Sequence, residues 1–296
     1  MRHLPAPFVV GVPRSGSTLL RLMLDAHSEL AIPFETHFVP DLIDAAGKQG
    51  TSPERLAEMV ITHYRWGDFR LDADELRDRF RALERPTPGA FVRAFYKLYA
   101  ERQAKPRWGD KTPKYQMHMR RIEQARPEAR FIHLIRDDRD VALSVLRLHF
   151  GPDSVEGAAE RWKNRIEKAR SQNQGLNLYL EVRYEDLVLD IESTLRRVCE
   201  FCGLPWDPAV LRYYERAEER PQEKARDLPP RRPGQSFRPP ALRISHALTK
   251  EPPRDDRVGR WRTEKSAADR AVYERIAGNL LAELGYEIGE TLHEHY

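Results

Sequence analysis

The stretch that decides the fold is FVVGVPRSGST, residues 8–18. Its first five residues form an apolar run typical of a buried strand, and the apolar residues that follow, Leu19, Leu20, Met23 and Leu24, recur on one face of a helix. A glycine-containing loop between a strand and a helix exposes backbone N–H groups beside the positive end of the helix, and this arrangement holds phosphate groups. The stretch therefore predicts a phosphate-binding loop.

The loop copies the nucleotide-binding spacing G-x-x-x-x-G followed by lysine and Ser/Thr, with one exception. Ser17 stands at the lysine position, and the positive charge comes instead from Arg14 within the loop. We find no obvious acidic residue at the end of a later strand to hold Mg²⁺. These two features disfavour an ATPase or kinase, although another P-loop small-molecule kinase remains the first alternative.

Strand patterns alternate with helix patterns along the chain. The strongest later strand, residues 130–136 (RFIHLIR), has the near-continuous apolar centre of a buried parallel strand. Weaker strand patterns cover residues 30–32 and 178–184, and helix patterns cover residues 155–172 and 266–284. This order predicts an α/β fold, a P-loop-like three-layer α/β/α arrangement with a central parallel sheet.

Two long segments interrupt this alternation within what we interpret as a single domain, residues 1–296. Residues 52–105 are charged and helical, and predict a helical insertion between strands, over one end of the sheet. Residues 220–256 contain eight prolines and little periodicity. A loop of this length inside a compact domain is often functional, so we favour a lid over the sheet, with a linker as the alternative.

Composition limits the classes of partner. The formal net charge is +4 and the basic residues are spread along the chain, which disfavours nucleic acid and suits an anionic small molecule. No apolar stretch has the length of a membrane span, so the expected location is the cytoplasm. Cys199 and Cys202 lie in a helical pattern on one face, and we interpret them as packed, reduced core residues rather than a redox or zinc site.

The motif P-R-S-G-[ST]-T after a strand resembles the phosphosulfate-binding loop of sulfotransferases. These enzymes have a P-loop-like fold and use 3′-phosphoadenosine 5′-phosphosulfate (PAPS), leaving 3′-phosphoadenosine 5′-phosphate (PAP). The version here is most similar to the tyrosylprotein and related bacterial branches, which carry arginine in the loop. The resemblance implies that the 5′-phosphosulfate is held by Arg14, Ser15, Gly16, Ser17 and Thr18.

Later segments extend the resemblance over about 250 residues. Arg136 and Ser144, eight residues apart across a strand-to-helix junction, resemble the family's 3′-phosphate clamp in the pattern R-D-x-R-D-x-x-x-S. Tyr184, in a Y-E-D-L segment, is implied to approach the adenine. A C-terminal segment similar to R-x-G-x-W is implied to close on the 3′-phosphate side; its residues here are Arg257, Gly259, Arg260 and Trp261.

The resemblance also implies catalytic roles. Glu35 matches the glutamate general base of the tyrosylprotein branch, and His37 is its rival. Cytosolic sulfotransferases use a histidine after a K-T-H pattern, and this chain has Pro113 at that histidine position. Arg14 and Lys111 are the candidates to stabilise transition-state charge, and no metal is expected. Gly259 stands where the tyrosylprotein branch has a serine.

The acceptor is the least determined part. We expect a hydroxyl of a small molecule, glycolipid or carbohydrate, and consider a peptide tyrosine less favoured. Five aromatic residues are candidates for an apolar acceptor pocket, although their helical spacing is more typical of core: Tyr64, Trp66, Phe91, Phe95 and Tyr96. A non-catalytic protein that binds PAPS or PAP is the second alternative. The sequence leaves a homodimer open.

Overall fold

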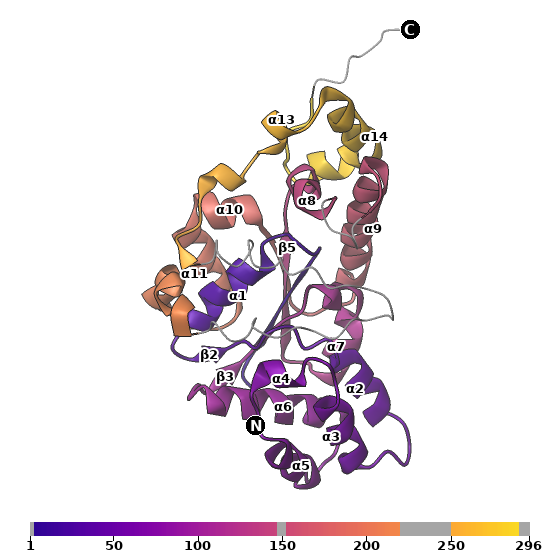
Figure 1. Cartoon of the computed structure of the whole chain (residues 1–296). Helices are drawn as coiled ribbons and strands as arrows, with labels where there is room; N and C mark the ends of the chain where they lie inside the picture. The colour runs from indigo at the N-terminus through magenta and orange to yellow at the C-terminus, as the bar shows by residue number, and fades with distance from the viewer. Residues whose placement is uncertain (1–2, 147–151, 220–249, 290–296) are drawn as a thin grey trace.

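A four-stranded parallel sheet lies at the centre of the computed structural model, which describes residues 3–146, 152–219 and 250–289 (Figure 1). The strand order is β4-β1-β5-β6. The strands are β1 (Ala6–Gly11), β4 (Asp110–Lys111), β5 (Ala129–Ile135) and β6 (Tyr179–Arg183). A separate parallel pair joins β2 (Leu30–Ala31) to β3 (Arg107–Trp108).

The two middle strands are buried on both faces. In the register between β1 and β5, Phe8 lies opposite Phe131 and Val9 opposite Ile132. Because successive side chains point to opposite faces, each of these pairs serves a different hydrophobic layer. This explains the continuous apolar runs and confirms the strands expected around residues 8–12 and 130–136. The two-residue strands β3 and β4 were not predicted, because two residues are too short to show a period.

Helices cover both faces of the sheet. The face of Val9 and Ile132 is covered by α1 (Ser17–Ala26), α10 (Tyr184–Leu189) and α11 (Ile191–Phe201). The face of Phe8 and Phe131 is covered by α2 (Val39–Ala46), α6 (Pro88–Arg102) and α7 (Met119–Ala125). Beside these, α9 (Val155–Asn173) and α14 (Ala267–Glu283) pack over Val12 and Ile135. The predicted α/β/α architecture is confirmed.

The helical segment expected at residues 52–105 lies between β2 and β3. It consists of α3 (Pro53–Ile61), α4 (Trp66–Phe69), α5 (Ala73–Arg81) and α6. The side chains of Ser52 and Thr87 cap α3 and α6 by accepting hydrogen bonds from backbone N–H groups. The segment reaches the sheet through α6, whose Tyr96 ring meets the Phe8 ring edge-on with 6.3 Å between centroids. It therefore packs on one face of the sheet.

Five shorter elements complete the described fold. They are η1 (Pro113–Met117), α8 (Asp138–Val145), η2 (Pro208–Glu219), η5 (Asp255–Arg257) and α13 (Trp261–Glu264). Residues 220–249 of the expected lid lie outside the described residues. In the described end of this segment, the Tyr213 hydroxyl donates a hydrogen bond to the backbone oxygen of Glu251. The lid therefore stays a prediction.

Both cysteines are free and buried at the end of α11, as the sequence suggested. Burial raises the pKa of the Cys199 thiol to about 11 and that of the Cys202 thiol to about 12, so both stay protonated at neutral pH. Within the three described ranges, no helix combines the length and apolar character needed to cross a bilayer.

Candidate functional site

The loop between β1 and α1 is shaped by two close approaches. A Cβ atom at Gly11 would lie 2.5 Å from the carbonyl oxygen of Leu134 on β5, and one at Gly16 would lie 2.4 Å from the ring of Tyr184. Gly16 has a φ of 93°, which favours glycine, and it caps the start of α1. The Ser15 hydroxyl donates to the Val12 carbonyl at 2.6 Å and closes the loop. The first N–H groups of α1, which have no partner within the helix, follow directly at Ser17 and Thr18.

Arg14 places a half-buried positive charge inside this loop. Its Nε atom is buried and has no hydrogen-bond partner within the described part of the chain. Burial lowers the pKa of the Arg14 guanidinium, and the nearby charge of Arg136 lowers it further. Two cations thus converge at the ends of neighbouring strands, an arrangement that a bound anion would stabilise.

Arg136 follows β5 and connects the loop to the C-terminal segment. Its guanidinium lies 4.2 Å from the centroid of the Tyr184 ring, the same ring that covers Gly16. Its Nη2 donates to the backbone oxygen of Arg257 at 2.6 Å, and its Nε is buried without a partner in the described ranges. Arg14, Gly16, Arg136, Tyr184 and Arg257 therefore gather at the carboxyl ends of β1, β5 and β6. Ser144 lies in α8, and its side chain lies outside the described residues.

Asp140 on α8 fastens the C-terminal segment to this group. Its two carboxylate oxygens accept from the backbone N–H groups of Gly259 at 2.8 Å and Trp261 at 2.9 Å. Gly259 has a φ of 72°, a conformation that favours glycine and gives a reason for the missing serine. The Arg260 guanidinium pairs with Glu264, so that side chain is turned toward a neighbour on its own helical turn.

The Asp137 carboxylate shows why the acidic end of β5 is not free for a cation. Both of its oxygens accept from the Arg139 guanidinium, at 2.8 and 3.0 Å. The Arg139 guanidinium in turn lies 3.6 Å from the centroid of the Trp261 ring, which makes Trp261 a packing contact for the same segment. Asp137 follows a later strand, but its carboxylate is already paired, so it gives no reason to revise the expectation that an ATPase or kinase is disfavoured.

Glu35 and Lys111 form a second charged centre, across the edge of the sheet. Glu35 follows β2 and Lys111 ends β4, and Lys111 Nζ donates to Glu35 Oε1 at 2.8 Å. His37 Nε2 lies 2.9 Å from the other oxygen, Oε2. Burial raises the pKa of Glu35, but the Lys111 charge and the hydrogen bonds from His37 and Lys111 outweigh it, so the net pKa is lowered. Burial lowers the pKa of the fully buried Lys111, against the opposing effect of Glu35.

The site thus combines a phosphate-type loop, two converging arginines and a lysine–glutamate pair. A model of the sulfotransferase family matches residues 5–208, more than half of the chain. The chain belongs to the sulfotransferase family. It is 26% identical over 223 residues to a protein-tyrosine sulfotransferase of Drosophila melanogaster, covering 72% of this chain and 41% of the relative. To protein-tyrosine sulfotransferase 1 of Danio rerio it is 28% identical over 225 residues, covering 72% and 57%.

This sulfotransferase-family chain spans about half the length of the curated relatives it matches. Among solved structures, it is similar to the sulfotransferase domain of the Synechococcus PCC 7002 olefin synthase. The TM-score is 0.60 with 24% sequence identity, and the match covers 98% of each chain. This likeness shows a shared fold over nearly the whole chain, including the part beyond the family match.

A buried polar network lies beneath the Glu35–Lys111 pair of this sulfotransferase-family member. Asp110 Oδ2 accepts hydrogen bonds from the hydroxyls of Tyr96 at 2.8 Å, Thr36 at 2.9 Å and Thr112 at 3.2 Å. Burial raises the pKa of Asp110 to about 6, although the hydrogen bonds oppose the rise. The sequence did not predict this network: the motif at residues 108–113 gave a role to its lysine and none to the aspartate beside it.

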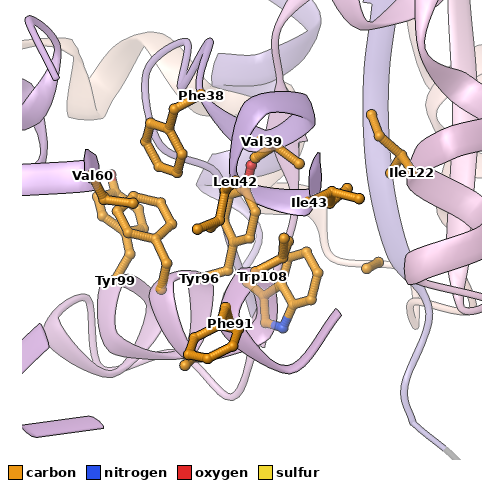
Figure 2. Packing of buried hydrophobic residues seen from close by; sticks show 14 of the residues in the cluster. Phe38, Val39, Leu42, Ile43, Val60, Phe91, Tyr96, Tyr99, Trp108 and Ile122 are labelled. Atoms are coloured by element: carbon orange, nitrogen blue, oxygen red, sulfur yellow. The ribbon is translucent and has the colours of Figure 1, made fainter. Parts of the chain in front are cut away.

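An open cavity of about 340 Å³ adjoins the Glu35 side of the centre. Its lining is polar, with only one residue, Tyr64, from the predicted aromatic set; the lining residues are His37, Pro40, Asp41, His63, Tyr64, Lys114, Tyr115 and His118. Phe91, Phe95 and Tyr96 instead pack in the core, and Trp66 packs against it. Figure 2 shows Phe91 and Tyr96 with Trp108, whose ring stacks on Tyr96 with 4.6 Å between centroids. The core interpretation, which their helical spacing favoured, is therefore confirmed for Phe91, Phe95 and Tyr96, because the apolar side chains of α6 are used in packing.

Proposed function

We propose that this chain transfers the sulfuryl group of PAPS to a hydroxyl group of an acceptor. The observation that carries the proposal is the pair Arg14 and Arg136, which converge beside the β1–α1 loop while the Arg14 Nε atom is buried without a partner among the described residues. A buried guanidinium nitrogen without a hydrogen-bond partner is unfavourable, and an anion with several oxygens would supply the partner. Membership of the sulfotransferase family makes PAPS the expected anion.

The binding roles follow from the position of each residue. The N–H groups of residues 16–18 and the Arg14 guanidinium hold the 5′-phosphosulfate end, and Ser15 shapes the loop through its hydrogen bonds to the Val12 carbonyl. Arg136 and Ser144 hold the 3′-phosphate, together with residues 257–261, which Asp140 fastens beside them. Tyr184, whose ring lies between Gly16 and Arg136, faces the adenosine part. Arg260 and Trp261 contribute by keeping this segment in place.

PAPS, when bound, supplies a sulfuryl group on a phosphate leaving group. Lys111 directs its ammonium toward the bridging oxygen that gains negative charge during in-line displacement, and Arg14 stabilises the same charge. Glu35 is held as a carboxylate by Lys111, so it stands ready to accept a proton. When Lys111 turns toward the leaving oxygen, the pKa of Glu35 rises because its strongest cationic neighbour has moved away. Glu35 then becomes a stronger base at the moment the acceptor hydroxyl loses its proton.

The proposed acceptor is a hydroxyl-bearing small molecule, glycolipid or carbohydrate. The polar cavity beside Glu35 supports an acceptor with several hydrogen-bonding groups over a wholly apolar one. The matched curated relatives are named for protein tyrosine, and a peptide tyrosine is the competing acceptor. A screen with one member of each class decides between them.

Thermal unfolding with PAP, beside ATP and AMP and without added metal, tests the nucleotide part of the proposal. A ligand held only by the native state stabilises it by about 2.7 kcal/mol at a hundredfold excess over its dissociation constant. We expect PAP to raise the midpoint well above the shifts produced by ATP and AMP, and Arg136→Ala to abolish that preference. No shift with PAP, or an equal shift with ATP, would contradict the proposal and favour a P-loop kinase.

A further inference from the structure

His37 lies between the Glu35 carboxylate and the polar cavity. Its ring lines the cavity, whereas Glu35 is not among the lining residues. Its Nε2 atom lies 2.9 Å from Glu35 Oε2, and the other Glu35 oxygen is occupied by Lys111 at 2.8 Å. His37 is therefore the member of the pair that lines the cavity, while the Glu35 side chain is itself partly exposed.

The backbone at His37 is held in an unfavourable conformation. Its φ is 60°, in the left-handed region that side chains other than glycine rarely adopt. Both neighbours are buried: the Thr36 N–H donates to the Thr112 hydroxyl at 3.1 Å, and the Phe38 ring packs edge-on to Phe95 with 4.9 Å between centroids. The imidazole stacks on the Tyr64 ring with 6.2 Å between centroids. Packing on both sides thus imposes the strain, which is a pattern found at functional sites.

The protonation state of His37 follows from its partner. A carboxylate only accepts hydrogen bonds, so Nε2 carries the hydrogen that points at Glu35 and Nδ1 keeps its lone pair. Burial lowers the pKa of His37, Glu35 raises it, and Arg65 and Lys114 lower it. The other titratable groups around the cavity are Asp41, His63, Tyr64, Tyr115 and His118. The neutral imidazole is favoured, as a base requires.

We propose that the acceptor binds in this cavity and passes its proton to Glu35 through His37. This inference deepens the proposed sulfuryl transfer and depends on it. The acceptor O–H bond breaks as its proton moves to Nδ1, while the Nε2–H proton moves to the Glu35 carboxylate. The acceptor oxygen forms the new bond to sulfur, and the old bond to the bridging oxygen breaks with its electron pair going to the 5′-phosphate of PAP. Glu35 remains the final base, and His37 is the residue that contacts the acceptor.

The test uses His37→Gly, with phenol and 4-nitrophenol as acceptor probes and PAPS as donor. Glycine adopts the φ of this position without strain, so the variant is expected to fold, and it leaves room for free imidazole. General acid–base catalysis contributes about 10²–10⁴-fold, so we expect a loss of about 10²-fold or more with phenol. The loss with 4-nitrophenol, assayed at a pH above its own pKa where it is largely ionised, should be less than about tenfold because no proton transfer is needed. Added imidazole should restore transfer to phenol.

Two controls separate a proton relay from a structural role. His3→Asn, at an exposed histidine outside the site, should leave both rates unchanged. Glu35→Gln should lose transfer to phenol without rescue by imidazole, since the final proton acceptor is gone. Equal losses of His37→Gly with the two phenols, or no rescue, would overturn the relay.

The same set of proteins separates this proposal from the proposed function. One outcome is that PAP stabilises the wild-type chain, the wild type transfers to phenol, and His37→Gly is unimpaired. This outcome overturns the relay and is consistent with the sulfotransferase proposal. If neither phenol is sulfated, hydrolysis of PAPS by water is measured in the same variants. The expectations are those for phenol: a loss in His37→Gly that imidazole restores, and a loss in Glu35→Gln that it does not. A chain that binds PAP but transfers to neither phenol nor water overturns the relay, and a chain that does not bind PAP overturns the proposed function itself.

Discussion

Single residues at this site are held in states that would be unfavourable on their own. Arg14 and His37 both have a left-handed backbone, with φ values of 77° and 60°. Lys111 is fully buried, and its charge depends on one partner, Glu35. Such features persist only where the surrounding structure imposes them, and they gather where function needs a fixed charge or direction. The Lys111–Glu35 pair offers the most direct test of this idea.

Replacing Lys111 with methionine keeps the length of the side chain and removes its charge. We expect sulfuryl transfer to fall by about 10²-fold or more, because one group that stabilises transition-state charge is lost. On the proposed assignment PAP affinity should fall less than transfer does, because the former bridging oxygen is only one of the several anionic oxygens of PAP. The free energy of unfolding should drop by about 1–3 kcal/mol, because Glu35 loses its partner. Single-turnover transfer, PAP calorimetry and urea unfolding measure the three effects.

Lys163→Met is the matched control, because Lys163 pairs only with Glu167 at the surface of α9. It should leave transfer, PAP affinity and stability close to wild type. If Lys111→Met lost PAP affinity as strongly as it lost transfer, Lys111 would be a nucleotide-binding residue and its assigned role would be wrong.

At the scale of elements, the site depends on α8 joining two distant parts of the chain. α8 begins directly after β5, so Arg136 and Asp140 sit on either side of the junction. Asp140 then binds the backbone of Gly259 and Trp261, more than a hundred residues later. The segment is tied through backbone N–H groups, so the tie does not depend on the side chains of the segment itself.

Asp140→Ala removes both acceptors of this tie. We expect PAP affinity to fall about tenfold to a hundredfold, because hydrogen bonds to a charged group contribute about 1.5–3 kcal/mol each and part of that holds the nucleotide-binding segment in place. Hydrogen exchange at the backbone N–H groups of residues 257–264 should accelerate in the same variant. Glu192→Gln, which breaks only the surface pair with Arg196 on α11, should change neither. Unchanged exchange in Asp140→Ala would show that the segment is held by other contacts.

At the scale of the whole molecule, the buried Asp110 network links the stability of the fold to pH. Asp110 has a pKa of about 6 in the folded chain, raised by burial from an ordinary value of 3.8. A carboxyl whose folded pKa is raised binds its proton more tightly in the native state, so its contribution to stability is present below pH 3.8 and is lost as pH rises to about 6. The lowered pKa of Glu35 has the opposite effect: its contribution to stability is present above the pKa of the unfolded chain and is lost as pH falls below it.

Asp110→Asn isolates this contribution, since asparagine keeps an oxygen that accepts from the hydroxyls of Tyr96, Thr36 and Thr112. We expect the stability of the variant relative to wild type to rise by about 2 kcal/mol between pH 4 and pH 6 and to stay nearly constant above pH 7. Chemical denaturation across this range measures the difference. A difference that does not change with pH would mean that Asp110 is already ionised at pH 4.

The sequence alone determined the parallel α/β fold and the family and predicted the phosphate loop, because these depend on local patterns: a strand, a glycine turn and a helix follow one another within residues 8–24. It also picked out Glu35 and Lys111 separately. Their pairing required β4 to lie beside β1, and two-residue strands leave no period to read.

Only the tertiary structure decided which polar groups face one another. The aromatic residues of α6 became core because Phe8 and Phe131 offered them an apolar face, and the cavity beside His37 was left to mostly polar residues from three separate segments. The strained backbone at His37 and the tie between Asp140 and Gly259 have the same origin. Contacts between residues far apart in the chain depend on how whole elements pack, and no local pattern contains that information.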